Sequence, residues 1–271
     1  MEPLLWQIKQ IVKSISGREA PNRIIPFQIK EDDIFLVSYP KSGTTWLKFL
    51  LTAYVTGQPF DLSNDMRKVI PDMHGQQQWI DAKATSRIIK SHYPFQKSFP
   101  KIIYIARDGR DVAVSYFFYQ KKFNKIHTDC SFSEFLAEFN AGNLPYGRWS
   151  DHVAKWIYKS NKKNFHLIKY ENLLHDTYSE LSKTLSFMTG LPESRLNQER
   201  IHLAVNSTEF SKMKSSEKKN TDTATDLKNS KQDISFFRSG KAGDFENYFS
   251  SSELRRFNQI HKHALKLLNY L

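Results

Sequence analysis

Short apolar segments alternate with longer amphipathic segments along most of the chain. The apolar segments have the length and the β-branched or aromatic content of buried strands, and they cover residues 34–38, 87–90, 101–106 and 165–169. Apolar residues at helical spacing follow three of them, at 44–55, from about 108 onwards and at 181–188. Strands that alternate with helices are typical of a parallel sheet covered on both faces. We therefore predict an α/β fold with a single doubly wound parallel sheet of four to five strands flanked by helices.

Two stretches depart from this alternation. Apolar residues recur at helical spacing between Leu4 and Ile15, so residues 1–30 are expected to form a helical extension that docks on the domain or lies on a membrane surface. Residues 214–233 are polar and nearly free of large apolar side chains, which predicts a mobile loop. Because aromatic residues resume after this loop, we interpret residues 1–271 as a single domain.

Composition narrows the class of ligand and the compartment. Forty Lys and Arg against 28 Asp and Glu give a formal net charge of +12, which suits nucleic acid, anionic lipid or a phosphorylated cofactor. The single cysteine, Cys130, cannot form an internal disulfide, which fits a reducing compartment. No apolar run approaches the roughly 20 residues of a membrane span. We expect a cytoplasmic protein with neither a signal peptide nor a transmembrane segment.

The turn after the first predicted strand has the composition of an anion-binding loop. It reads Tyr39-Pro40-Lys41-Ser42-Gly43-Thr44-Thr45-Trp46 and leads into a predicted helix, where backbone N–H groups and the helix dipole attract an anion. Gly43 lets the backbone approach closely, and Lys41 adds a positive charge. In the Walker A motif a Ser or Thr after the lysine holds Mg²⁺. Here Lys41 precedes the glycine, so we expect no metal at this site.

This loop resembles the 5′-phosphosulfate-binding loop of the cytosolic sulfotransferases. The resemblance implies a P-loop-NTPase-like sulfotransferase fold. It also implies transfer of a sulfuryl group from 3′-phosphoadenosine 5′-phosphosulfate (PAPS) to a hydroxyl or amine of a small-molecule acceptor, leaving 3′-phosphoadenosine 5′-phosphate (PAP). The loop residues that the resemblance assigns to the cofactor are Lys41, Ser42, Gly43, Thr44, Thr45 and Trp46.

Two side chains with catalytic chemistry follow the second predicted strand. Strand alternation sends Lys90 and His92 to the same side, and a histidine can accept a proton at neutral pH. The stretch from Lys90 to Pro94 is similar to the family's Lys-Thr-His-Leu-Pro, whose histidine is the catalytic base. We therefore predict an in-line attack in which His92 removes the acceptor proton, while Lys41 and Lys90 stabilise the developing charge.

Two further stretches resemble the family's binding site for the 3′-phosphate. Residues 104–116 match a pattern in which an Arg and a Ser eight residues later hold that phosphate, which implies this role for Arg107 and Ser115. The resemblance also implies that Ser115 holds Lys41 away from the sulfate until an acceptor arrives. Arg110 and Asp111 are explained equally well by structural ion pairs. Near the C-terminus, residues 236–245 are similar to the family's Arg-Lys-Gly motif, which assigns to the cofactor Phe237, Arg238, Ser239 and Gly240.

The Arg-Lys-Gly match departs from the family at one position. Ser239 stands where a lysine is usual, so either its hydroxyl or the nearby Lys241 would have to replace that charge.

Aromatic and hydroxyl side chains would complete a pocket for the adenine ring. Tyr170 begins a stretch similar to the family's Tyr-Glu-Asp-Leu, in which the tyrosine bonds the adenine. Thr208 and Phe210 belong to a stretch similar to Thr-Ser-Phe-x-x-Met, which places both at the base. Trp46 offers an aromatic face for stacking.

The resemblance fails at the dimer motif of the animal enzymes. That motif, Lys-x-x-x-Thr-Val-x-x-x-Glu, would fall at Glu246, Ser250, Ser251 and Arg255, which reverses the sign of both charged ends. We therefore expect a monomer or a differently built dimer. The stretch between Thr56 and Arg87 is also short for an animal member, which favours a bacterial one.

Two other functions share features with this sequence, and the acceptor stays open. A metal-dependent P-loop kinase would share the sheet, and a nucleic-acid-binding protein would share the charge; no nucleic-acid-binding module is recognised, so we expect no such partner. Several aromatic residues favour a planar or lipidic acceptor if they line a pocket, or are simply core: Phe117, Phe118, Tyr119, Phe123 and Trp149. Three lysines would face an anionic acceptor or form a solvated helix face: Lys121, Lys122 and Lys125.

Overall fold

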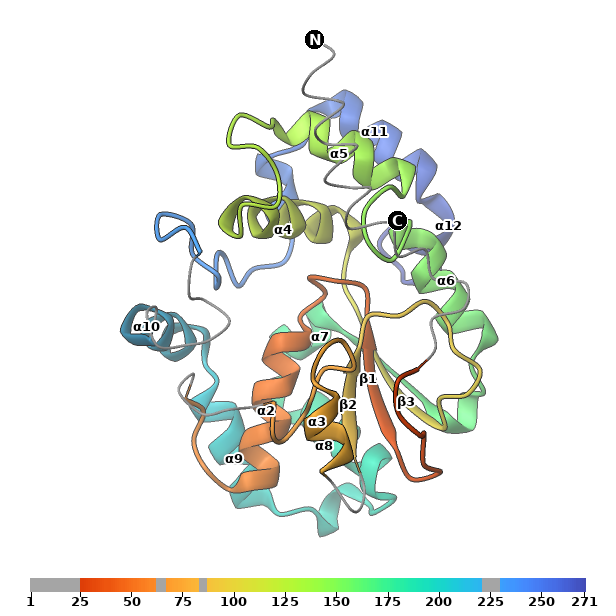
Figure 1. The fold of residues 1–271 in the computed structure, drawn as a ribbon, viewed down its shortest axis with the longest axis vertical. Coiled ribbons are helices and arrows are strands. Elements are labelled where there is room, and N and C mark those ends of the chain that lie inside the picture. Colours follow the sequence, from red (N-terminus) through yellow and green to blue (C-terminus); the bar gives the residue numbers. More distant parts are fainter. Residues whose placement is uncertain (1–24, 62–66, 83–86, 221–229) are drawn as a thin grey trace.

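The computed structural model describes residues 25–61, 67–82, 87–220 and 230–271. Within these ranges four strands pair in parallel into one sheet, in the order β2-β1-β3-β4. The strands are β1 (Ile34–Ser38), β2 (Ile88–Ser91), β3 (Lys101–Ala106) and β4 (Phe165–Lys169). This arrangement, seen in Figure 1, confirms the predicted single parallel sheet. Only β2 differs from its expected bounds, by one residue at each end.

Helices cover both faces of the sheet, which confirms that it is doubly wound. Successive strand residues point to opposite faces, so Phe35 and Val37 join one apolar core while Ile34 and Leu36 join the other. The first face carries α4 (Gly109–Lys122), α5 (Phe132–Ala141), α6 (Trp149–Lys159), α11 (Ser251–Ile260) and α12 (Lys262–Leu267). The second carries α2 (Thr44–Thr56), α7 (Tyr170–His175), α8 (Thr177–Thr189) and α9 (Gln198–Ser207). Figure 1 shows α5 and α11 at the top of the molecule and α8 and α9 at the bottom.

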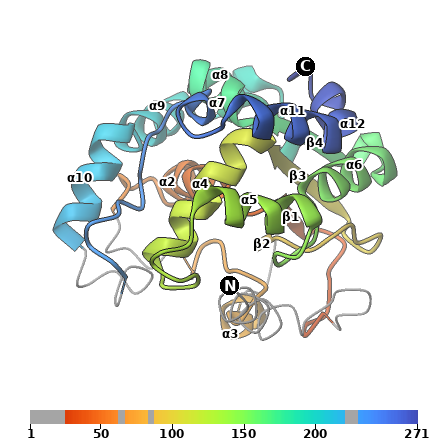
Figure 2. The same cartoon turned by 90° about the horizontal axis from the view of Figure 1, so that it is seen from above.

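The other helical elements of the described residues are short or lie beside the sheet. They are α3 (Gln77–Asp81), α10 (Phe210–Asn220), η1 (Lys162–Asn164), η2 (Glu193–Arg195) and η3 (Asp244–Asn247), the last three being 3₁₀ helices. Figures 1 and 2 both show α10 at one edge of the molecule, beside the segment that follows residue 230. None of the helices in the described ranges is long and apolar enough to cross a membrane.

The predicted loop at 214–233 needs a correction at both ends. Residues 214–220 are the second half of α10, because Met213 and Glu217 are buried on one face of that helix. At the other end, Ser230 is buried and the Lys231 amide donates to the backbone of α4 at 2.8 Å. The polar composition of this stretch gave no indication of the helix or of the buried Ser230. The rest of the expected loop, 221–229, lies outside the described residues.

The expected N-terminal extension is described only at its end. Residues 1–24 lie outside the described residues, and 25–30 are not helical. Phe27 packs on the first apolar core. A buried ion pair follows, in which the Arg87 guanidinium donates to the two Asp33 carboxylate oxygens at 2.7 and 2.6 Å. This pair connects the residue before β1 to the residue before β2.

The parallel strands bring four loops to one edge of the sheet. Residue 39 follows β1, His92 follows β2, Arg107 follows β3 and Tyr170 follows β4. Ligands of open parallel sheets bind beyond this carboxyl edge. The fold therefore gathers there four of the stretches that the sequence singled out.

Candidate active site

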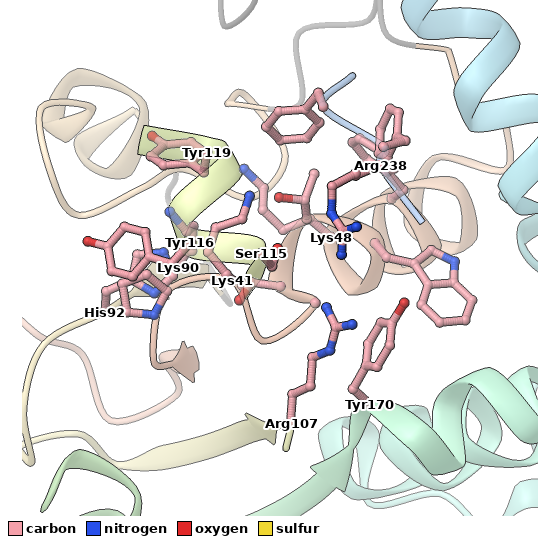
Figure 3. Close-up of a pocket in the computed structure, with 18 of the residues that line it drawn as sticks. Lys41, Lys48, Lys90, His92, Arg107, Ser115, Tyr116, Tyr119, Tyr170 and Arg238 are labelled. Carbon is pink, nitrogen blue, oxygen red and sulfur yellow. The ribbon is translucent and has the colours of Figure 1, made fainter. Parts of the chain in front are cut away.

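A cavity of about 860 Å³ lies at the carboxyl edge of the sheet. Its walls include most of the residues that the sequence assigned to the site: Lys41, Gly43, Thr44, Thr45, Trp46, Lys90, His92, Arg107, Ser115, Tyr170, Phe210, Phe237, Arg238, Ser239 and Gly240. Figure 3 shows Lys90 and His92 at one end, Arg107, Tyr170 and Arg238 at the other, and Lys41 between them. The imidazole of His92 and the guanidinium groups of Arg107 and Arg238 therefore lie at opposite ends of one cavity.

The loop between β1 and α2 has a backbone that few residues adopt. Lys41 has φ 72° and Gly43 has φ 103°, both in the left-handed region. Gly43 is the N-cap of α2, so the helix begins at the cavity wall. A Cβ on Gly43 would lie 2.6 Å from the ring of Tyr170. Glycine is required here both by the backbone angle and by the close approach of that ring.

Lys41 is a partly buried cation among other cations. Its ammonium lies over the rings of Tyr119 and Phe236, 4.5 and 4.9 Å from their centroids. Burial, followed by the charges of Arg107, Lys90 and other neighbours, lowers the pKa of Lys41 to about 7. A negative charge bound in the cavity would offset this repulsion. The cluster of positive charges in the cavity therefore favours the binding of an anion.

The hydrogen bonds of His92 determine its tautomer. Its Nδ1 atom lies 2.8 Å from the carbonyl oxygen of Ser38, which can only accept. Nδ1 therefore carries the proton and donates it, and Nε2 keeps its lone pair. Burial and then the charge of Lys90 hold the pKa of His92 well below its usual range. A neutral imidazole with a free Nε2 is the form that accepts a proton.

Lys90 forms an ion pair that the sequence did not predict. Its Nζ atom bonds to the carboxylate of Asp72, from the segment before α3. Asp72 also accepts from the His74 amide at 3.0 Å. Although burial opposes it, the charge of Lys90 helps to lower the pKa of Asp72 to about 2, so Asp72 is ionised at neutral pH. Both Asp72 and His74 line the cavity, and no sequence motif indicated them.

Arg107 lies at the other end of the cavity with part of its guanidinium unsatisfied. Its Nη2 donates to the Lys241 carbonyl at 3.0 Å and lies 3.7 Å from Asp111, and the guanidinium stacks 4.2 Å over the Tyr170 ring. Within the described part of the chain, the buried Nε atom of Arg107 has no hydrogen-bond partner. A buried N–H group without a partner is costly unless a ligand supplies an acceptor.

The motif near the C-terminus lines the same end of the cavity. Arg238 donates to the Tyr248 hydroxyl at 3.0 Å and pairs with Asp244 at 2.5 Å. Ser239 faces the cavity, whereas the exposed Lys241 does not line it and approaches Arg107 only through its carbonyl. Of the two residues that could replace the missing lysine, the geometry favours Ser239.

Rings and small residues shape the wall around this end. Trp46 and Tyr170 meet edge to face with centroids 5.9 Å apart. Phe210 packs against Gly240, where a Cβ would lie 2.4 Å from the ring. In the described ranges the buried indole Nε1 of Trp46 has no hydrogen-bond partner.

Two residues assigned to the cofactor lie behind the cavity wall. The hydroxyl of Thr208 donates to the Ala204 carbonyl at 2.9 Å, at the end of α9. The Ser42 hydroxyl is buried, with no partner among the described residues. Neither side chain lines the cavity.

The five aromatic residues considered for the acceptor have different positions. Tyr119 and Phe123 line the cavity, Phe117 and Trp149 are core residues, and Phe118 is partly buried against that core. Lys125 lines the cavity and donates to the Tyr119 hydroxyl at 3.2 Å. Around His92 the walls add several polar groups that sequence reasoning missed: Gln76, Tyr116, Gln120 and Tyr146. The end of the cavity that holds His92 is therefore lined by tyrosine rings and by the side-chain amides of two glutamines.

Known proteins are similar to this chain in sequence and in fold. Residues 31–269 match the family of sulfotransferase domains. Sulfotransferase 1 family member D1 of Rattus norvegicus is 30% identical over 275 residues, 95% of this chain and 88% of the rat protein. The 3-beta-hydroxysteroid sulfotransferase of Cavia porcellus is 31% identical over 252 residues, 88% of this chain and 85% of that protein. The mouse sulfotransferase SULT7A1, solved in complex with PAP, is 28% identical with a TM-score of 0.69, over 95% of this chain and 88% of the mouse chain.

These matches and the cavity agree on the class of protein. The chain belongs to the sulfotransferase domain family, and it is an enzyme of that class.

Proposed function

We propose that this sulfotransferase moves a sulfuryl group from PAPS to a hydroxyl or amine of a small-molecule acceptor, with His92 as the general base. The observation that carries the proposal is the proton on Nδ1 of His92, which donates to the Ser38 carbonyl and leaves Nε2 free. This base lies in the same cavity as Lys41, Arg107 and Arg238. Family membership makes the kinase and nucleic-acid alternatives unnecessary.

The residues of the cavity fit a nucleotide with phosphates at its 5′ and 3′ positions. Nε of Arg107 and Nε1 of Trp46, which have no partner among the described residues, can each donate to a ligand, and a nearby anion would stabilise the charged form of Lys41. The mouse sulfotransferase with 28% identity was solved with PAP, which supports the same nucleotide here. We assign the 5′ end to the loop from Lys41 to Trp46 and the 3′-phosphate to Arg107, Ser115, Arg238 and Ser239.

The chemistry follows from the two ends of the cavity. The donor supplies an activated sulfuryl group, whose bond to the 5′-phosphate oxygen breaks during the transfer. Nε2 of His92 takes the acceptor proton while the acceptor oxygen or nitrogen forms its bond to sulfur. Lys41 stabilises the negative charge left on the phosphate oxygen, and Lys90 stabilises charge on the sulfuryl oxygens. Ser115, which lines the same part of the cavity as Lys41, would restrain that lysine before an acceptor binds.

The compartment and the oligomeric state complete the proposal. We place the enzyme in the cytoplasm, since the buried Cys130 has no partner for a disulfide. We expect a monomer, or a dimer built differently from the animal enzymes. Ser250 is the N-cap of α11 and shares a capping box with Glu253, so part of the matching segment has a local role. For the expected N-terminal extension, residues 1–30, contact with a membrane surface stays an alternative to docking on the domain.

A transfer assay tests the proposal. Purified protein is mixed with PAPS labelled in its sulfuryl group and, in turn, with a phenol, an alcohol and an amine, without added metal. We expect labelled product with at least one acceptor class and stoichiometric release of PAP. Failure of every acceptor, combined with phosphoryl transfer from ATP and Mg²⁺, would reject it.

A further inference from the structure

A buried lysine and a buried glutamate connect α4 and α10 to residues 231–237. These residues begin the segment 231–245, which lines the nucleotide end of the cavity with Arg238 and Ser239. Lys122 is 2% exposed and Glu217 is 6% exposed, and Nζ of one lies 3.6 Å from Oε1 of the other. The sequence predicted either a solvated face or an acceptor contact for Lys122, and a mobile loop around Glu217. Both predictions are wrong, because each charge finds its partner across the fold.

Glu217 uses both carboxylate oxygens to hold the backbone of the segment. Its Oε1 accepts from the Phe236 amide at 2.6 Å, and its Oε2 accepts from the Phe237 amide at 3.0 Å and from the Ser235 hydroxyl at 2.9 Å. A carboxylate that spans two successive amides fixes the direction of an irregular backbone, and such charge-assisted bonds are strong when water is excluded.

Lys122 holds the chain just before those residues. Its Nζ donates to the carbonyls of Lys231 and Ile234 at 3.0 and 2.7 Å, and its own carbonyl accepts from the Lys231 amide at 2.8 Å. Since both charges are buried, removing one would leave the other uncompensated. Residues 231–234 are thereby attached to the last turn of α4, and Glu217 attaches residues 235–237 to α10.

The first turn of the same helix holds the other end of the segment. Asp111 accepts from the amides of Gly243 and Phe245 at 2.8 and 3.0 Å. The residues between these two attachments include Arg238 and Ser239, which line the cavity. Helix α4 also carries Ser115, so one rigid element aligns both parts of the expected 3′-phosphate site.

We propose that Lys122 and Glu217 are positioning residues for the nucleotide, which set Arg238 and Ser239 at the 3′-phosphate. The inference rests on the proposed function, because the segment recognises a 3′-phosphate only if PAP is the ligand. Neither side chain lines the main cavity, although Lys122 lines a small hollow beside it that Arg238 also lines. Both side chains hold the backbone of residues 234–237, which leads directly to Arg238.

Calorimetric titration with PAP and with adenosine 5′-phosphate tests this inference. In Glu217→Gln the amide NH₂ faces a backbone N–H group in place of an acceptor, so the segment should shift. We expect the preference for PAP over adenosine 5′-phosphate to fall at least fivefold. The matched control is Asp33→Asn, which breaks a pair of similar burial before β1 and β2. Both variants should have a lower Tm, but Asp33→Asn should keep the preference within twofold.

The outcomes separate this inference from the function beneath it. If the unaltered enzyme does not prefer PAP, the proposed function fails. If the enzyme prefers PAP and Glu217→Gln keeps that preference, the positioning role alone is overturned. Should Glu217→Gln not fold, the double variant Lys122→Met with Glu217→Met removes both charges together and leaves no unpaired one. Loss of preference in that variant supports the role, and its retention overturns it.

Discussion

At the scale of the residue, the catalytic end of the cavity depends on which nitrogen of one imidazole carries the proton. The Ser38 carbonyl holds that proton on Nδ1 of His92, 2.8 Å away. Lys90 lies beside the ring but is engaged by Asp72, so its charge is partly balanced. His92 lines the cavity, and its unprotonated Nε2 would suit the proposed role of a base that takes the acceptor proton.

Replacing His92 should stop turnover and spare nucleotide binding. We expect His92→Ala to lose at least about 100-fold in kcat, because general-base catalysis typically contributes that much. The dissociation constant for PAP should stay within about twofold, since the base lies away from the nucleotide end. His74→Ala is the control, since His74 lines the same cavity and its loss should cost less than about tenfold. An equal loss in both variants would contradict the assignment of the base.

The pH dependence of kcat provides a second test of His92. Burial and Lys90 lower the pKa of His92, so the imidazole stays neutral as pH falls through its usual range. Activity should therefore be constant around pH 6.5 and decline only at lower pH. A half-maximal rate near pH 6.5 that is governed by His92 would show that the imidazole is not held neutral.

Lys41 should make nucleotide binding take up a proton. The free site has a pKa of about 7 for Lys41, and a bound anion raises it because the anion favours the ammonium form. Affinity for PAP should be highest below pH 7 and decline as pH rises above it. Titrations at pH 8 in buffers of different ionisation enthalpy measure the uptake directly. Lys41→Met should abolish the uptake and weaken binding about tenfold or more, the loss of one charge-assisted bond.

At the scale of the element, the wall around the nucleotide depends on glycines that neighbouring rings cover. Gly240 has φ 65° and lies against the ring of Phe210, whereas Gly243 has φ 79° and open space where a Cβ would stand. Any other residue would have a similar backbone strain at the two positions. Only at Gly240 would its side chain also displace a neighbour, the ring of Phe210.

Gly240→Ala should therefore weaken PAP binding more than Gly243→Ala. Each variant pays roughly 1 kcal/mol for the left-handed backbone. Only Gly240→Ala also displaces Phe210 from the cavity wall, at a further cost of about 1–3 kcal/mol for overpacking, which corresponds to about 5- to 150-fold weaker binding. Titration of both variants checks this, and equal affinities would show that the contact between Phe210 and Gly240 does not shape the site.

The elements themselves were predictable where local patterns are strong. β1, β3 and β4 have the bounds that their apolar runs predicted, and α2 begins at Thr44 as its spacing indicated. The helix at 214–220 was missed because its surface is polar. Its buried residue, Glu217, has partners 18 to 95 positions away in the sequence: Ser235, Phe236, Phe237 and Lys122. No local pattern encodes such partners.

At the scale of the whole molecule, some residues of the site could be predicted from local sequence patterns and others could not. Lys41, His92, Arg107 and Tyr170 each follow a strand, so strand prediction and the rule for parallel sheets bring them to one edge. Asp72, Lys125 and Tyr146 reach the cavity from connecting segments. No periodic pattern in the sequence indicates which residues of a connecting segment line a cavity, because the packing of the whole chain determines their positions.

The central claim is that this cavity recognises a nucleotide through its 3′-phosphate. Calorimetric titration of the enzyme with PAP, adenosine 5′-phosphate and ATP, all without magnesium, tests it most directly. Contacts of Arg107 and Arg238 with an added phosphate predict that PAP binds at least about 100-fold more tightly than adenosine 5′-phosphate, at about 1.5–3 kcal/mol for each charge-assisted bond. Equal binding of PAP and adenosine 5′-phosphate, or tighter binding of ATP than of PAP, would contradict the account.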